Sequence, residues 1–137
     1  MTSNVIYDGD QRTICTHIRS GSIIETDAPV DNQGKGERFS PTDLLATSLA
    51  SCMLTIMGMK GESMGLDMKR IKVEVLKTMA AYPRRVSRIN LSFHFPEHLL
   101  SIESKTKTIL KNAGYTCPVA KSIYPEIEVV VDWGRWE

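Results

Sequence analysis

The fold depends most on the stretch Ser40–Met57, which reads SPTDLLATSLASCMLTIM. Ser40 is a favourable N-cap residue, Pro41 suits the first helical position, and Asp43 stands where a capping box has its acidic residue. From Leu44 onward the apolar residues fall on almost every side of the predicted helix rather than on one stripe. A helix of that kind is buried, so this stretch predicts a central helix inside the core.

The length and composition are those of one ordinary globular domain. The chain has 137 residues, 42% of them hydrophobic and 24% charged, and we expect a single domain over residues 1–137. A formal net charge of +1 gives no electrostatic reason to expect nucleic acid or a membrane surface as a partner. The polar start Met1–Asn4 lacks the pattern of a signal peptide, and the apolar run Leu44–Met57 is too short to span a bilayer. The sequence therefore predicts a cytoplasmic protein.

The remaining patterns place strands on both sides of the central helix. Alternation of apolar and polar residues predicts strands within residues 3–27, 71–75, 89–95 and 127–133. Residues 97–112 are amphipathic and predict a helix, with Gly114 as its C-terminal cap, and a short helical piece is expected from Cys117. This order of elements favours an α+β fold with antiparallel sheets around a buried helix.

The central helix also predicts a partner subunit. One small sheet covers only one side of a helix, whereas this helix is apolar all round. In a chain this short, a second copy of the protein is the natural source of the missing cover. We therefore expect a homodimer with a large apolar interface that involves residues 41–58.

The three cysteines are a poor disulfide framework for a cytoplasmic chain, so paired cysteines would be catalytic or redox-active. Cys117 precedes Pro118 at a predicted helix start, where free backbone N–H groups favour a thiolate. Cys52 lies about three turns inside its helix in apolar surroundings, so its ionisation needs a cation from elsewhere in the fold. Cys15 has nothing nearby to activate it and is interpreted as a structural or surface thiol. The plain alternative is that all three are buried small side chains.

The cysteines and histidines are not spaced like the ligands of a zinc site, and we expect no metal. His94 and His98 are four residues apart, but a strand end and Pro96 separate them, and both are interpreted as exposed. A serine hydrolase is also unsupported, because the stretch before Cys52 has no glycine-flanked serine.

Two separated motifs resemble the OsmC/Ohr family. The first is Phe39–Cys52, FSPTDLLATSLASC, which is similar to the family's Pro-initiated, alanine-rich central helix ending in a cysteine. The second is Gly114–Ser122, GYTCPVAKS, which is similar to the family's Cys-Pro segment with the second cysteine. The resemblance covers essentially the whole chain, and the loop over residues 27–36 resembles a less characterised branch of the family.

This resemblance implies an intertwined homodimer with buried central helices and an active site at the subunit interface. It implies a peroxidase acting on organic hydroperoxides or hydrogen peroxide. Cys52 would be oxidised to a sulfenic acid, and Cys117 would condense with it to form a disulfide. An external dithiol, which in the family is a lipoyl group, would reduce the disulfide, and no bound cofactor is needed.

The family also uses an arginine to hold the thiolate and a glutamate to hold the arginine. Arg12 is the first choice by its position after a predicted turn, with Arg19 and Arg38 as alternatives. Related hydroperoxide-resistance proteins have the glutamate directly after the motif proline, where this chain has Thr42. Asp43 is a candidate for the carboxylate, although its position favours a role in the capping box.

Three functions stay open on the sequence. The leading hypothesis is a peroxidase. The second is a redox sensor or thiol-exchange protein, in which the cysteine pair forms a disulfide without efficient peroxide turnover. The third is a non-catalytic dimeric binding module with structural cysteines.

Overall fold

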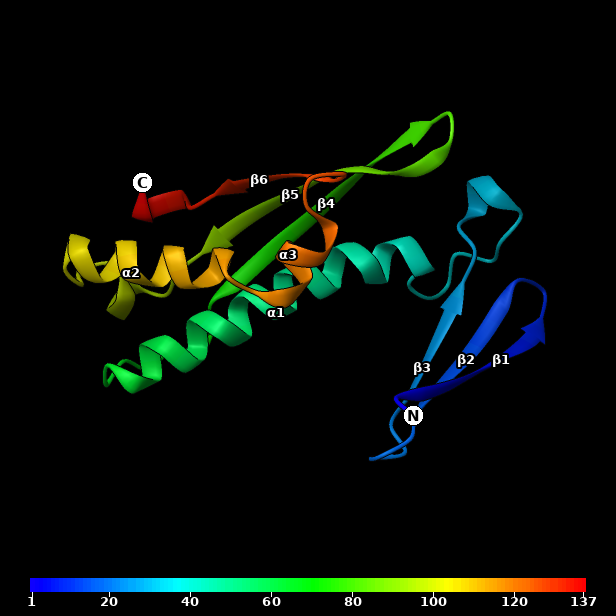
Figure 1. The fold of residues 1–137 in the computed structure, drawn as a ribbon, viewed down its shortest axis with the longest axis horizontal. Helices are drawn as coiled ribbons and strands as arrows, with labels where there is room; N and C mark the ends of the chain where they lie inside the picture. Colours follow the sequence, from blue (N-terminus) through cyan, green and yellow to red (C-terminus); the bar gives the residue numbers. More distant parts are fainter. The chain divides into compact units, whose positions relative to one another are not determined.

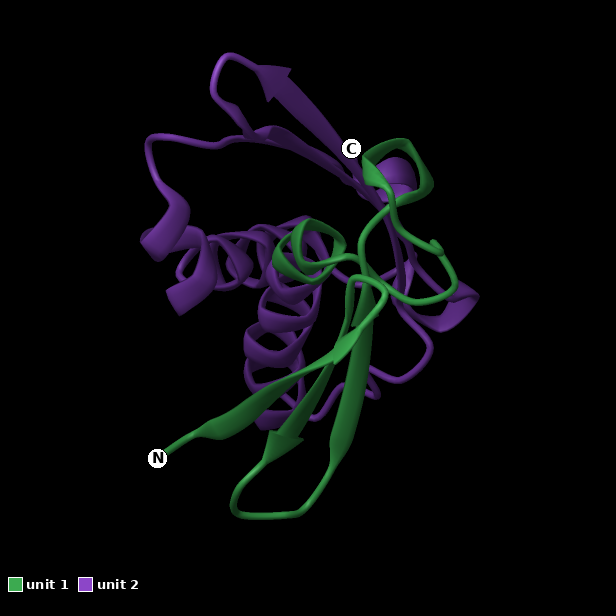
Figure 2. Ribbon diagram, turned by 90° about the vertical axis from the view of Figure 1, so that its right-hand side faces the viewer, with its two compact units in different colours: residues 1–45 green, residues 46–137 purple.

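A computed structural model describes all residues from 1 to 137 (Figure 1). The chain divides into two compact units, Met1–Leu45 and Ala46–Glu137, which Figure 2 shows in different colours. Both units contribute a small three-stranded sheet, and all the longer helical segments after Leu45 belong to the second unit. The α+β class predicted from the sequence is confirmed.

The N-terminal unit is built on an antiparallel sheet. Its strands are β1 (Ser3–Gly9), β2 (Arg12–His17) and β3 (Ile23–Asp27), which pair in that order. The turn between β1 and β2 uses left-handed backbone at Asp10 and Gln11, with φ of 53° and 60°. Such a turn matches the twist of the strands it joins. The strands predicted within residues 3–27 are confirmed.

Apolar side chains are exposed on both faces of this N-terminal sheet. On one face, Ile6 and Ile23 are each 61% exposed, and on the other face Val5 is 62% exposed. Successive residues of a strand alternate between faces, so neither side of the sheet is a purely solvated surface. An antiparallel sheet that meets water on one side normally shows apolar residues on one face only.

The first turn of α1 (Pro41–Ser63) is closed by the predicted capping box. The backbone N–H of Asp43 donates to Ser40 Oγ at 3.0 Å, and the backbone N–H of Ser40 donates to the Asp43 carboxylate at 2.9 Å. Two N–H groups that helix formation would leave unpaired are thereby satisfied. The helix continues past Gly58 and Gly61 and ends at Ser63.

The C-terminal unit contains a mixed sheet rather than the antiparallel one predicted. Strands β4 (Lys72–Ala81) and β5 (Arg84–His94) are antiparallel, but β6 (Glu128–Asp132) runs parallel to β5. The reason is the connection, because the chain passes through helical segments before β6 and re-enters the sheet from the same end. Figure 1 shows these helices on one side of the sheet.

One stripe of α1 packs on the core of the C-terminal unit. Leu49, Met53 and Met57 are fully buried and belong to one cluster with the inward side chains of β5. The opposite stripe is open: Met59 is 62% exposed, and a groove runs along the helix past Ser51 and Thr55. The apolar run predicted a segment too short to span a bilayer, but the whole of α1 is long and apolar enough to do so. Its buried stripe makes it a core helix of this unit.

The predicted helix over residues 97–112 is wrong at both ends. A 3₁₀ turn, η2 (Glu97–Leu99), comes first, and α2 spans Ser104–Tyr115. The break has a long-range cause, since the indole N–H of Trp136 donates to the carbonyl of Leu99 at 3.0 Å and takes an acceptor that a continuous helix would use. Gly114 lies inside α2 and is not its cap. A side chain there would press on Met53 and Met57, so glycine lets α2 approach α1 closely.

The remaining segments close the unit. Helix α3 (Pro118–Ile123) follows α2 and confirms the helical piece expected after Cys117. After β6, the 3₁₀ turn η3 (Gly134–Trp136) brings Trp136 face to face with Phe95, with ring centroids 3.7 Å apart. A short 3₁₀ turn, η1 (Val30–Asn32), lies in the loop of the N-terminal unit.

Candidate active site

Cys117 is held at the start of α3. It is the N-cap residue, and its sulfur accepts a hydrogen bond from the backbone N–H of Ala120 at 3.3 Å. The side chain is fully buried in the core of the C-terminal unit. The position predicted from the Cys-Pro dipeptide is therefore confirmed, but the thiol is enclosed rather than open to solvent.

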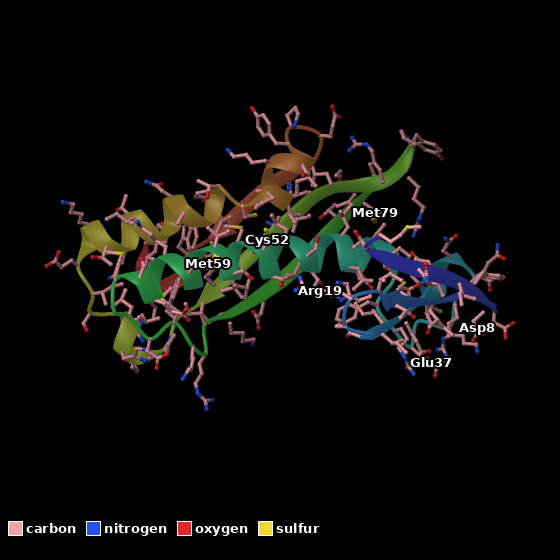
Figure 3. The ribbon with its side chains drawn as sticks, turned by 60° about the horizontal axis from the view of Figure 1, so that its bottom comes forward. Asp8, Arg19, Glu37, Cys52, Met59 and Met79 are labelled. Carbon is pink, nitrogen blue, oxygen red and sulfur yellow. The ribbon has the colours of Figure 1, made fainter.

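Cys52 lies midway along α1 (Figure 3), and the structure brings it to Cys117. Both residues belong to the packed cluster of the C-terminal unit, and Cys52 is close enough to raise the pKa of Cys117, although 65 positions along the sequence separate α1 from α3 at these residues. Both are free thiols, and Cys52 is half-buried where Cys117 is buried. The two cysteines named from the sequence thus form one local site in the C-terminal unit.

The surroundings oppose ionisation of Cys117. Burial raises the pKa of this thiol above its ordinary value, the Ala120 amide lowers it in part, and the neighbouring Cys52 sulfur raises it further. The sequence argument that Cys117 is the easily ionised thiol is therefore wrong. A helix start favours a thiolate only when the backbone N–H groups stabilise the charge by more than its desolvation costs.

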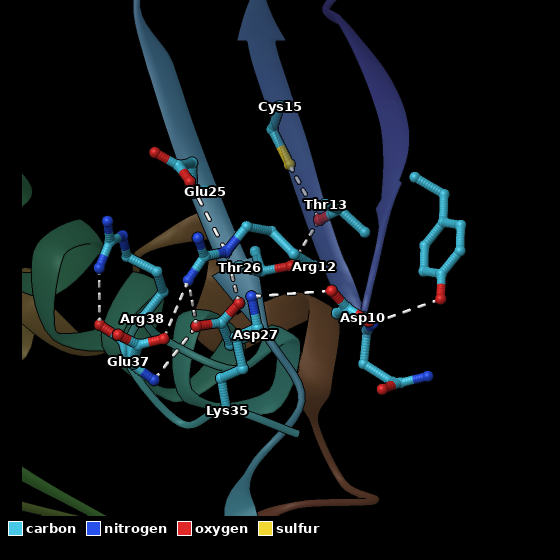
Figure 4. A network of polar contacts seen from close by, with 12 residues as sticks. Asp10, Arg12, Thr13, Cys15, Glu25, Thr26, Asp27, Lys35, Glu37 and Arg38 are labelled. Atoms are coloured by element: carbon cyan, nitrogen blue, oxygen red, sulfur yellow. Dashed lines mark hydrogen bonds and ion pairs between the residues drawn. The ribbon is translucent and has the colours of Figure 1, made fainter. Parts of the chain in front are cut away.

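Arg12 forms the best-defined ion pair of the N-terminal unit (Figure 4). Its Nε donates to Asp27 Oδ1 at 2.8 Å and its Nη2 donates to Oδ2 at 2.9 Å. The backbone N–H of Glu37 donates to the same carboxylate at 3.1 Å. Asp27 is fully buried, and the Arg12 side chain keeps 18% of its surface exposed. This fork-to-fork geometry fixes the guanidinium plane.

The charges of this pair are mutually stabilised. Hydrogen bonding to Arg12 holds the pKa of Asp27 below its usual range, against the opposing effect of burial. The same hydrogen bond raises the pKa of Arg12, so both groups stay ionised. Two further carboxylates, Glu25 and Glu37, each lie 3.7 Å from the guanidinium. The bonds to Asp27 all use the Nε and Nη2 side, which leaves Nη1 available to another anion.

Of the other sequence candidates, Arg38 belongs to the network around Arg12 and Asp27, and its charge helps to lower the pKa of Asp27. Arg19 is exposed in the turn between β2 and β3, and Arg38 is exposed and donates to the carbonyl of Glu37 at 3.1 Å. Asp43 takes the capping role described above. Cys15 is half-buried on β2, with its sulfur 3.9 Å from Thr13 Oγ1.

Comparisons with known proteins place the chain in a family. Residues 34–132 match the family model described as OsmC-like protein. A solved structure from Psychrobacter arcticus 273-4, named provisionally as an osmotic stress induced and detoxification response protein, is 55% identical with a TM-score of 0.91, over 96% of this chain and 94% of that one. This chain belongs to the OsmC-like family. No curated protein matches it.

More distant members share the OsmC-like fold. An organic hydroperoxide resistance protein OsmC from Legionella pneumophila is 12% identical with a TM-score of 0.69, over 96% of each chain. The organic hydroperoxide resistance protein OhrB of Bacillus subtilis is 15% identical with a TM-score of 0.58, over 96% of this chain and 97% of that one. At these identities the likeness is one of fold. The OsmC-like family thus includes organic hydroperoxide resistance proteins.

Asp27 is the partner of Arg12 that sequence reasoning missed. The family pattern places the carboxylate after the motif proline, at Thr42, and the sequence offered its neighbour Asp43 instead. The register of the hairpin could have identified Asp27, because Arg12 pairs directly with Asp27 across β2 and β3. Opposite residues of neighbouring strands point to the same face, so an acidic residue paired with Arg12 was a candidate from the hairpin pattern alone.

Proposed function

We propose that this OsmC-like protein is a thiol-dependent peroxidase. The Cys52 thiolate attacks the O–O bond of a hydroperoxide, releases an alcohol or water after protonation of the leaving oxygen, and becomes a sulfenic acid. The Cys117 thiol then attacks that sulfur, and the pair forms a disulfide with loss of water. An external dithiol such as a lipoyl group reduces the disulfide by exchange, so sulfur carries both electrons through the cycle.

The observation that carries this proposal is the meeting of Cys52 and Cys117. The two residues lie in one packed cluster, and Cys52 is close enough to raise the pKa of Cys117, so a sulfenic acid on Cys52 would have a resolving thiol as its neighbour. The more accessible of the two is Cys52, which suits the thiol that meets the peroxide, while buried Cys117 suits the thiol that reacts only with its neighbour. The order of roles therefore follows from exposure as well as from the family resemblance.

Arg12 is proposed as the cation that stabilises the Cys52 thiolate, with Asp27 as the carboxylate that fixes it. Asp27 thus substitutes for the glutamate absent at Thr42. The support is the two-point hydrogen bonding of the guanidinium, which leaves its Nη1 side available. The two residues belong to different compact units, so the proposal predicts a functional coupling that kinetics can detect.

A homodimer is the assembly we propose for this chemistry. The open groove along α1 and the apolar side chains on both faces of the N-terminal sheet are surfaces that a second copy would cover. Members of the family assemble in this way. A cytoplasmic location accords with three unpaired cysteines and belongs to the same proposal.

Hydroperoxide consumption with a dithiol reductant tests the peroxidase. We expect Cys52→Ser to lose all turnover, and Cys117→Ser to consume about one equivalent and stop at a sulfenic acid that a 1,3-diketone traps. Cys15→Ser is the matched control and should keep the wild-type rate. Wild-type protein without turnover, or turnover unaffected by Cys52→Ser, would exclude the peroxidase.

Thiol exchange without efficient peroxide turnover is the second candidate. The observation that favours it is the presence of two free cysteines in one packed cluster, because such a pair can form a disulfide whether or not peroxide turnover is efficient. The two functions separate in one comparison, in which the reduced protein is oxidised either by a hydroperoxide or by an oxidised dithiol. A peroxidase reacts faster with the hydroperoxide, and an exchange protein reacts faster with the dithiol.

A further inference from the structure

The loop that follows β3, residues 27–39, folds back on its own start. At its ends, the backbone N–H of Asp27 donates to the carbonyl of Phe39 at 3.2 Å. Within the loop, the N–H of Gly36 donates to the carbonyl of Ala28, also at 3.2 Å. The second half of the loop is thereby held against its beginning.

Two glycines, in the segment Gly34–Gly36 that reads GKG, make this return of the chain possible. A Cβ at Gly34 would overlap the carbonyl oxygen of Ala28, so any side chain there forces the backbone to move. Gly36 has a φ of 65°, and a Cβ there would lie 2.7 Å from Cγ2 of Val30. The first position therefore requires glycine for space, and the second favours it for its left-handed backbone.

The closed loop brings one hydrogen-bond donor to the buried carboxylate of Asp27 (Figure 4). Glu37 directly follows Gly36, and its backbone N–H donates to Asp27 Oδ2 at 3.1 Å. Hydrogen bonding to Arg12 lowers the pKa of Asp27 most, and the Glu37 amide and the charge of Arg38 lower it further. The donor on Glu37 is its backbone, so the position of the loop decides whether this bond forms.

We propose that Gly34 and Gly36 are positioning residues for the guanidinium of Arg12. They keep the loop closed so that the Glu37 amide fixes Asp27, and Asp27 in turn holds the guanidinium in one plane. A side chain at either glycine pushes the loop outward and withdraws the amide, which leaves the carboxylate free to turn together with the arginine. The action of Arg12 on Cys52 rests on the proposed peroxidase, whereas the hold of the loop on Asp27 does not.

Gly34→Ala in the full chain tests this role with two measurements. Carbon-detected NMR follows the titration of the Asp27 carboxyl, whose pKa should rise from its lowered value toward the ordinary 3.8 once the amide is withdrawn. Hydroperoxide turnover should fall roughly tenfold at neutral pH, because the guanidinium is no longer held in place. A glycine with a merely structural role would lower the melting temperature on substitution and leave the Asp27 titration unchanged.

Two control variants separate the loop closure from general effects of substitution. Gly21 lies in the same unit with a φ of 75°, but no atom lies within 4 Å of its Cβ position. Gly21→Ala should therefore lower stability through backbone strain and change neither the Asp27 pKa nor turnover. Lys35→Met alters only the side chain between the two glycines, which lies 3.9 Å from Asp10, and should likewise change neither quantity.

Gly36→Ala keeps the test decisive if Gly34→Ala does not fold, because its added Cβ meets the side chain of Val30, which is 76% exposed and can move. It should show the same two changes to a smaller extent, and Val30→Ala in the same chain should partly reverse them. An unshifted Asp27 titration in the folded glycine variants overturns the positioning role and leaves the peroxidase standing. Wild-type protein without turnover would sink the peroxidase, and the Asp27 titration alone would then decide whether the glycines hold the ion pair.

Discussion

In the N-terminal unit Arg12 meets Asp27 as two full charges, and in the C-terminal unit Cys52 meets Cys117 as two free thiols. The charged pair has two hydrogen bonds of 2.8 and 2.9 Å, and a backbone N–H supports its buried carboxylate. The thiol pair has one backbone donor, from Ala120 to Cys117, within an apolar cluster. The charged pair is therefore held in one arrangement, whereas nothing polar fixes Cys52.

In the proposed peroxidase, this difference would give the two pairs different roles. A guanidinium is useful to a reaction only if it is oriented beforehand, and the buried carboxylate provides that orientation. A peroxidatic sulfur must move from its reduced position to bond with a second sulfur. The fixed ion pair and the thiol pair thus lie in separate units of the chain.

Asp27→Asn should break the Arg12–Asp27 ion pair and gives the largest expected effect on stability. The amide keeps the size of the side chain but leaves Arg12 without its anionic partner at a buried position. We expect the melting temperature to fall by roughly 5–10 °C. Peroxide turnover should fall with it, because the guanidinium is no longer fixed. Thermal melts and rate measurements on one preparation give both quantities.

Glu37→Gln is the matched control, because its carboxylate lies 3.7 Å from Arg12 and the side chain is 61% exposed. It should change the melting temperature little. The pKa of Asp27 is lowered from its ordinary 3.8, so the pair stabilises the fold above that pH, and the stabilisation is lost as the pH falls toward the folded value. The gap between wild type and Asp27→Asn should therefore shrink below about pH 4. A gap that is constant from pH 7 to pH 3 contradicts the ion-pair explanation.

The two thiols, Cys52 and Cys117, should differ in their rates of alkylation. Cys52 is half-buried, whereas Cys117 is buried and its pKa is raised above the ordinary 9.0. With limiting iodoacetamide at pH 8, we expect Cys52 to be alkylated at least about tenfold faster than Cys117. Peptide mass spectrometry measures the ratio, and unfolding in denaturant should bring it close to one. Faster labelling of Cys117 in the folded protein would reverse the assigned roles.

The local features of the fold could be predicted from the sequence. The capping box at Ser40 and Asp43 depends on residues three apart, and the strands of the N-terminal unit depend on alternation within each strand. The break before α2 could not be predicted in this way, because its cause is the indole of Trp136 near the other end of the chain. The parallel direction of β6 likewise depends on how the helices return the chain.

In the candidate site, too, the features that depend on local sequence could be predicted and those that depend on distant contacts could not. Cys52 and Cys117 were found because their motifs are local, but the buried state of Cys117 depends on the packed cluster around it, which no short motif encodes. Asp27 was within reach, since it pairs with Arg12 in a simple hairpin register. It was missed because the family pattern directed attention to Thr42, a position on α1.

Gly114→Ala gives the smallest expected effect and tests how closely the helices beside the thiol pair are packed. Helix propensity alone favours alanine by about 1 kcal/mol inside α2. A Cβ at this position, however, would lie 3.1 Å from the Met57 sulfur and 3.3 Å from Met53 Cε. Because both methionine side chains are flexible, the close contacts should cost about as much as the propensity gain, and the free energy of unfolding should stay within about 1 kcal/mol of the wild-type value. Denaturant unfolding measures the change, and a gain near the full propensity value would show that α2 stands further from α1 than the structure has it.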